Sequence, residues 1–293
     1  MEKNSKITSD IEWYNKNDVT TPEQLLKFAN DNNKIDFTGK IVKLGNDIHL
    51  NGTTWIPIGT EAKPFNGTFD GNNHVISGVY IKNSNVCQGL FGYIGSSGKI
   101  KNLKVKDSCI KGDNYVGGFA GINKGKISNS CYEGKVTGRN YVGGLVGANE
   151  GSISNSYSNS TVTGNCNNGE VGGIGGLVGE NWGKIDNCYS SGKVTGKENV
   201  GGLVGKNNDI YSNENKSKND EFLWKNPLKK PLTWINNSYY EKDASEQNDR
   251  GKGEGKTTAE MKDQKTYTDW DFSKIWGLNS NENNGYPYLL NRQ

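Results

Sequence analysis

Residues 143–149, Gly-Gly-Leu-Val-Gly-Ala-Asn, belong to a repeat from which the fold can be inferred. Residues 153–157, Ile-Ser-Asn-Ser-Tyr, and residues 162–164, Val-Thr-Gly, complete the unit. Equivalent segments, in which one glycine precedes and one follows two apolar residues, occur at 89–92, 118–121, 144–147, 176–179 and 202–205. Their first apolar residues lie 29, 26, 32 and 26 residues apart, so the basic unit has about 26 residues.

Each unit contains short alternating apolar runs, which predict strands of about three to five residues. Gly and Asn separate these runs, and both residues tolerate left-handed turns. A 26-residue unit of this kind has the size of one coil of a β-solenoid, in which equivalent residues stack about 4.8 Å apart. We therefore expect an all-β parallel solenoid of seven or eight coils. A β-propeller fits less well, because its blades need roughly 40 residues.

Stacking of coils places each repeated residue on its counterpart, so repeated Leu, Val and Ile should form apolar ladders inside the solenoid. An Asn four residues after the motif centre should form an amide ladder, in which each side chain bonds the next one. The asparagines at this position are Asn123, Asn149, Asn181 and Asn207.

This repeat resembles the GLUG-motif repeats of bacterial surface and secreted proteins, which include adhesin-like proteins and the N-terminal regions of IgA-type metallopeptidases. Trp-Ile-Pro-Ile-Gly at 55–59 and Phe-Asn-Gly-Thr-Phe-Asp-Gly at 65–71 resemble the lead-in of that family, and residues 270–289 resemble its closing segment. The resemblance implies a right-handed parallel β-helix at a cell surface or in the medium. The zinc motif HExxH of the metallopeptidases is missing, since His49 and His74 are the two histidines of the chain.

The chain divides into three parts on this pattern. Residues 1–40 should form an N-terminal cap, because Thr-Pro-Glu-Gln at 21–24 predicts a capped helix over about 22–31. Residues 41–240 should form the solenoid, with an insertion at about 208–233. Residues 241–293 should form a C-terminal capping segment, with a short helix over 258–264 and an aromatic stretch at 270–289 that closes the C-terminal end.

Composition excludes several classes of partner. The net charge is +3, which is too balanced to predict nucleic-acid binding. No apolar run reaches the roughly 18 residues of a membrane helix, so we expect no membrane insertion. The first ten residues lack the apolar segment of a signal peptide, so an extracellular or cell-surface location would depend on a signal that is not visible here. The oligomeric state stays open.

The sequence offers little support for catalysis, and we expect no enzyme, no metal and no cofactor. Acidic residues in the repeats occupy different positions in successive units, so no pair marks a hydrolase cleft. Asp70 and His74 could form a metal or acid–base site, but a tight turn through Asp-Gly-Asn-Asn explains the same residues. The five cysteines are odd in number and should be small buried residues. They are Cys87, Cys109, Cys131, Cys166 and Cys188.

The insertion supplies the candidate binding site, because exposed aromatic rings beside polar groups suit glycan or protein recognition. Its aromatic residues are Tyr211, Phe222, Trp224 and Trp234. The same rings could instead pack on the flank of the solenoid, and the loop at 166–171 is a second candidate. We therefore expect a non-enzymatic, adhesin-like module that binds a glycan or a protein on a host or neighbouring cell. A structural spacer and a polysaccharide-active β-helix enzyme are the alternatives.

Overall fold

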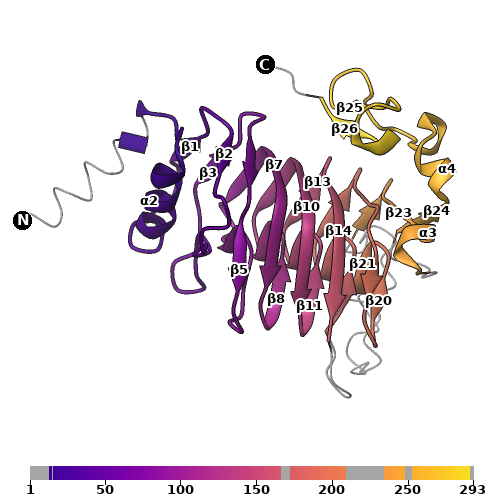
Figure 1. The fold of residues 1–293 in the computed structure, drawn as a ribbon, viewed down its shortest axis with the longest axis horizontal. Coiled ribbons are helices and arrows are strands. Elements are labelled where there is room, and N and C mark those ends of the chain that lie inside the picture. The colour runs from indigo at the N-terminus through magenta and orange to yellow at the C-terminus, as the bar shows by residue number, and fades with distance from the viewer. Residues whose placement is uncertain (1–12, 15, 166–171, 209–233, 248–252, 291–293) are drawn as a thin grey trace, which may run out of the picture.

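The computed structural model describes residues 13–14, 16–165, 172–208, 234–247 and 253–290. These residues form a parallel β-solenoid of about six turns with a spacing of about 27 residues, which confirms the predicted fold (Figure 1). The turn number is lower than the predicted seven or eight. The steps between stacked positions vary in length, up to the 50 residues from Ile185 to Ile235 that contain the predicted insertion.

Three parallel sheets form the sides of the coil. Fifteen strands of the described residues make the largest sheet: β1 (Ile41–Lys43), β2 (Ile48–His49), β3 (Thr68–Asp70), β4 (Val75–Ser77), β5 (Tyr80–Lys82), β7 (Lys99–Lys111), β10 (Lys126–Gly138), β13 (Ser152–Ser154), β14 (Tyr157–Gly164), β17 (Lys184–Asp186), β18 (Tyr189–Ser190), β19 (Val194–Thr195), β22 (Trp234–Asn236), β23 (Tyr239–Glu241) and β24 (Glu254–Lys256).

The other two sheets contain the glycine-rich strands. One of them consists of β6 (Phe91–Ile94), β9 (Ala120–Asn123), β12 (Val146–Asn149), β16 (Val178–Asn181) and β21 (Val204–Asn207). The other consists of β8 (Asn114–Gly117), β11 (Asn140–Gly143), β15 (Ile174–Gly175) and β20 (Val200–Gly201). Strands of these two sheets approach each other closely: a Cβ atom on Gly179 would lie 2.7 Å from the carbonyl carbon of Tyr141. The second glycine of the motif is therefore required for packing.

Apolar ladders fill the interior as predicted. The motif centres Leu90, Phe119, Leu145, Leu177 and Leu203 are all fully buried. A second ladder follows the Ile-x-Asn positions and consists of Ile100, Ile127, Ile153 and Ile185, which pair in register from strand to strand. Because each coil contributes a few such residues, a chain with 32% hydrophobic residues forms a continuous core.

The predicted amide ladder is also present. Asn123 donates through Nδ2 to Oδ1 of Asn149 at 2.8 Å, and Asn149 donates in the same way to Asn181 at 2.8 Å. Asn181 then donates to Oδ1 of Asn207 at 2.9 Å. The first three side chains are fully buried, so the ladder satisfies amides that would otherwise be costly inside the coil.

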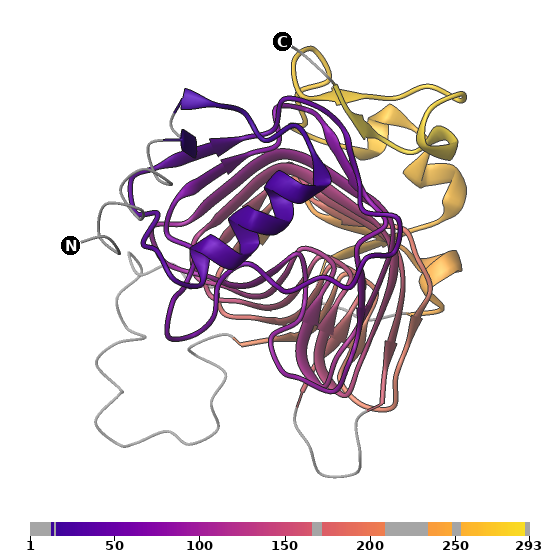
Figure 2. The ribbon, with the colours of Figure 1, turned by 60° about the vertical axis from the view of Figure 1, so that its left-hand side comes forward.

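A helix covers the N-terminal end of the solenoid, as Figure 2 shows. Helix α2 (Pro22–Asn32) begins at the predicted capping box, in which Gln24 N donates to Thr21 Oγ1 at 3.3 Å. Phe28 is fully buried and contacts Phe37 edge to face at 5.2 Å. The helix therefore closes the core where stacking strands are missing.

The C-terminal segment lies along a flank of the solenoid, whereas the sequence led us to place residues 270–289 over its C-terminal end. The reason is a ladder of outward-facing tyrosines, Tyr157, Tyr189 and Tyr239, which needs an apolar cover. Tyr189 donates its hydroxyl to the carbonyl oxygen of Pro287 at 2.6 Å, although 98 residues separate them.

The elements of this segment are short. They are the helices α3 (Lys242–Ser245) and α4 (Thr258–Met261), the 3₁₀ helices η2 (Gln264–Thr266) and η3 (Asn283–Gly285), and the antiparallel strands β25 (Trp276–Gly277) and β26 (Tyr288–Leu289). Helix α4 begins at the capping box of Thr257 and Glu260, as predicted. It ends at Met261, three residues before the predicted end at residue 264. Trp270 joins the cover by donating from Nε1 to the carbonyl oxygen of Asn237 at 2.9 Å.

The cysteines differ in their burial. Cys131 and Cys188 are buried, as predicted for small apolar residues. Burial raises the pKa of the Cys188 thiol to about 12. The prediction is wrong for Cys109, which is exposed because it lies on the outward side of strand β7.

Candidate functional site

The aromatic site predicted in the insertion cannot be placed. Tyr211, Phe222 and Trp224 lie outside the described residues. Trp234 begins strand β22, and its backbone pairs in register with Lys184. The recognition role of these four residues stays a prediction.

Asp70 and His74 form a turn and do not form a common site. Asp70 accepts a hydrogen bond from the backbone N–H of Asn72 at 2.9 Å and pairs with Lys101 at 2.7 Å. His74 instead contacts Asp47, with 3.1 Å between Nδ1 and Oδ1. Within the described residues, no group of three or more His, Cys, Asp or Glu side chains is arranged to hold a metal ion.

Acidic side chains of the repeats form ion pairs with basic side chains of neighbouring coils. Glu133 pairs with Lys104 at 2.8 Å and Glu150 with Lys124 at 3.1 Å. Further pairs of this kind are Asp113 with Arg139 and Glu180 with Lys206. The carboxylates are thus bound by cations along the stack, and none of these pairs brings two carboxylates together.

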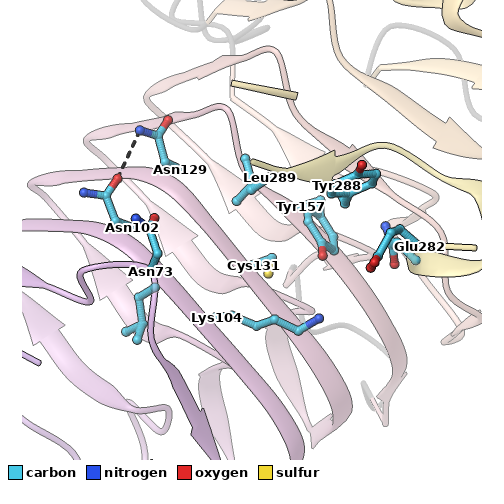
Figure 3. A pocket seen from close by; sticks show the side chains of 11 residues that line it. Asn73, Asn102, Lys104, Asn129, Cys131, Tyr157, Glu282, Tyr288 and Leu289 are labelled. Carbon is cyan, nitrogen blue, oxygen red and sulfur yellow. Dashed lines mark hydrogen bonds between the residues drawn. The ribbon is translucent and has the colours of Figure 1, made fainter. Parts of the chain in front are cut away.

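A cleft of about 280 Å³ lies between the solenoid and the C-terminal segment (Figure 3). Amide side chains of the solenoid form one side, and Glu282 and Tyr288 of the C-terminal segment form the other. The lining residues are Asn73, Asn102, Leu103, Lys104, Asn129, Cys131, Tyr157, Glu282, Asn283, Tyr288 and Leu289. The cleft therefore offers hydrogen-bond donors, acceptors and apolar surface within one small volume.

Lys104 is the cation of the cleft. Burial lowers its pKa, but the hydrogen bond and the charge of the Glu133 carboxylate oppose burial, and the pKa is raised above its ordinary value. Tyr157 also donates its hydroxyl to Glu133 Oε1 at 3.2 Å. Burial raises the pKa of Cys131 to about 12, so this residue is a thiol at neutral pH and is no nucleophile.

The amide side of the cleft is a hydrogen-bonded row. Asn129 donates through Nδ2 to Oδ1 of Asn102 at 3.2 Å, the bond drawn in Figure 3. Asn102 donates in turn to Asp70 at 3.1 Å. The Oδ1 atom of Asn129 is buried and has no hydrogen-bond partner in the described part of the chain. A ligand hydroxyl or a water molecule is the kind of donor that would satisfy such an acceptor.

Trp182 is an exposed aromatic residue that the sequence analysis missed. Its side chain is 47% exposed, which is unusual for so large an apolar residue. The repeat register contained the signal, because the equivalent positions hold Lys124, Glu150 and Asn208, which are polar. A tryptophan at a position that otherwise faces water marks a surface suited to stacking contacts.

Comparisons with known proteins agree with this fold. The GLUG motif matches residues 138–163 and 170–195. Halomucin from Haloquadratum walsbyi is 40% identical over 75 residues, which is 25% of this chain and 1% of halomucin. A protein from Evansella cellulosilytica, provisionally named a Gly-rich membrane protein, is 45% identical over 56 residues, which is 18% of this chain and 6% of that protein. The chain thus spans a small fraction of the length of these relatives.

One solved structure shares the fold over nearly the whole chain. It is a Bacteroides ovatus protein with the provisional name immunoglobulin A1 protease, with a TM-score of 0.68 and 19% identity. The alignment covers 94% of this chain and 92% of that one. None of the helices in the described residues has the length and apolar character needed to cross a membrane. The chain therefore carries the GLUG motif, the repeat that its own sequence indicated, within a β-solenoid.

Proposed function

We propose that the protein is a non-enzymatic, adhesin-like module that binds a glycan at a cell surface or in the medium. The cleft beside the C-terminal segment carries this proposal. It combines the amides of Asn102 and Asn129, the cation of Lys104 and the ring of Tyr288. Sugar hydroxyls both donate and accept hydrogen bonds, and the sugar ring packs on aromatic and apolar side chains.

The size of the cleft favours a small unit of a larger ligand. Its volume of about 280 Å³ lies at the lower end of the range for small-molecule sites. A terminal sugar of a glycan would fit such a volume, with the rest of the chain outside. The solenoid coils and the C-terminal segment both contribute to the lining, so the site is positioned by packed elements.

The relatives support the proposed location. Halomucin and the Gly-rich membrane protein carry names that point to secreted or membrane-associated proteins. We infer an extracellular or surface position for this chain, with a glycan or a protein on a host or neighbouring cell as its partner.

A glycan and host-protein array tests the proposal, with the wild-type chain and a Lys104→Gln/Glu282→Gln variant. We expect a glycan signal that falls about tenfold in this variant, since two polar contacts are lost. Lys106→Gln is the matched control, because Lys106 lies on the same strand outside the lining. The Trp224→Ala variant tests the predicted insertion in the same assay.

The outcomes separate the alternatives. Loss of the signal in Trp224→Ala alone would move the binding site from the cleft to the insertion. A protein ligand in place of a glycan would keep the binding function and change the partner. If no glycan or protein binds, the binding function is wrong and the spacer interpretation stands.

A further inference from the structure

Lysines form a row on the outer face of the largest sheet. Lys99 of β7 pairs in register with Lys126 of β10, and both side chains are exposed. The same position continues with Ser152 of β13 and the exposed Lys184 of β17. We call Lys99, Lys126, Ser152 and Lys184 the lysine row. Because coils stack about 4.8 Å apart, the charges of Lys99 and Lys126 lie one coil apart, and Lys184 follows two coils further along.

Two members of the lysine row lack an acidic partner. The third, Lys184, pairs with Asp186 at 3.3 Å, and neighbouring lysines are also paired, Lys101 with Asp70 and Lys124 with Glu150. For Lys99 and Lys126, no ion pair exists among the residues that the structure describes. Like charges directly opposite each other on adjacent strands destabilise a sheet. A bound anion would remove this repulsion.

Trp182 belongs to the same coil as Lys184 of the lysine row. It stands two residues before Lys184 in the same coil, on the turn that leads into β17. Trp182 occupies the position that Glu150 holds in the preceding coil, and its backbone N–H donates to the carbonyl oxygen of Asn149 at 2.7 Å. The coil of Lys184 therefore also presents an exposed aromatic ring, and such a ring packs against the apolar face of a sugar.

We propose that the lysine row and Trp182 bind a linear anionic polysaccharide that runs along the axis of the solenoid. The coil spacing of about 4.8 Å is close to the length of one sugar unit in an extended chain, so acidic groups of adjacent sugars would meet Lys99 and Lys126, and a group two sugars further along would meet Lys184. Either carboxylate or sulfate groups on the polysaccharide would supply the negative charge that pairs with the lysines. This surface is a second site, because neither Trp182 nor any residue of the lysine row lines the cleft.

The arrangement favours a polysaccharide over a nucleic acid. The cations form a single narrow row, and the whole chain has a net charge of only +3. Nucleic-acid sites use broader basic surfaces that follow the phosphate backbone. A polysaccharide with one acidic group per sugar matches a single row and also uses the tryptophan.

The test measures binding of polygalacturonate and dextran sulfate to the full chain, with neutral dextran and duplex DNA as comparison probes. The Lys99→Gln/Lys126→Gln variant should bind the acidic polysaccharide about tenfold more weakly, since each exposed ion pair contributes a few-fold in affinity. Trp182→Ala should weaken binding as well. Thermal unfolding checks that each variant is folded.

A matched control distinguishes a site from general charge. Lys111→Gln/Lys135→Gln removes two exposed lysines from the same strands, β7 and β10, on another face. This variant should bind like the wild type. Equal weakening in both double variants, no binding of either acidic probe at low salt, or preferential binding of DNA would each overturn the proposal. Preference for one acidic probe would identify carboxylate or sulfate as the recognised group. Because the cleft variants leave this surface unchanged, the result is independent of the function proposed above.

Discussion

Two rows of asparagine run along the solenoid, and they exist for different physical reasons. The inner row, Asn123, Asn149, Asn181 and Asn207, joins its amides by hydrogen bonds of 2.8 to 2.9 Å. The outer row lies at a corner of the coil and consists of Asn102, Asn129, Asn155, Asn187 and Asn237. Every residue of the outer row has a left-handed backbone, with φ between 42° and 53°.

One repeated residue type is therefore needed for its side chain in the inner row and for its backbone conformation in the outer row. In the inner row, the buried amide is needed because each one satisfies its neighbour. In the outer row, the left-handed turn is needed, and Asn adopts it more readily than most other residues. The two rows should therefore respond differently to the same substitution.

Asn149→Ala should cause the largest loss of stability. The substitution removes the 2.8 Å bonds of Asn123 Nδ2 and Asn181 Oδ1, which keep only longer bonds to Ser152 O at 3.5 Å and from Gly183 N at 3.3 Å. A buried polar group that loses a partner costs about 1–3 kcal/mol, so the free energy of unfolding should fall by about 2–4 kcal/mol. Urea denaturation measures it, with the exposed Asn165→Ala as control. A loss equal to that of the control would contradict the role of the inner row.

A pair of variants at Asn129 should separate the contribution of the backbone to stability from that of the side chain in the outer row. Asn129→Ala and Asn129→Gly both remove the amide that donates to Asn102 at 3.2 Å. Only the alanine is strained at φ 48°, so it should be less stable than the glycine variant by about 1 kcal/mol. The same denaturation assay measures the difference. Equal stability of the two variants would show that the left-handed turn is not the reason for Asn at this corner.

The core and both asparagine rows follow from the sequence because the repeat supplies a register. Once Leu145 and Leu177 are known to be equivalent, stacking places them on each other, and the fully buried ladder follows. The N-terminal helix was predictable for a local reason. The capping box of Thr21 and Gln24 needs only neighbouring residues, and the structure shows both of its hydrogen bonds.

The cleft could not be predicted, because the register says which residues point outward but not what covers them. Tyr189 and Pro287 meet across 98 residues of sequence, and no repeat connects them. Trp182 is a different case, since its position in the register was available and its neighbours were polar. The insertion holds several aromatic residues, whereas Trp182 is a single exposed ring within the regular stack, so composition favours the insertion as a binding site.

The smallest expected effect concerns pH and again separates the two rows. The first asparagine of the outer row is bonded to an ionisable residue, since Asn102 donates to Asp70 at 3.1 Å. Burial raises the pKa of Asp70, but hydrogen bonds from Lys101, Asn72 and Asn102 outweigh burial and hold the pKa below its ordinary value. The inner row contains amides alone and does not titrate.

A pKa that is lower in the folded state than in the unfolded state stabilises the fold whenever the carboxylate is charged in both states. This contribution of Asp70 is complete at neutral pH and decreases below about pH 4, as the pH falls through the folded pKa. Asp70→Asn should therefore lower stability slightly at pH 7 and flatten its acid dependence. Thermal unfolding between pH 7 and pH 2 measures both effects. If the acid limbs of wild type and variant coincide, Asp70 does not anchor the outer row through its charge, and the row would depend on its left-handed backbone alone.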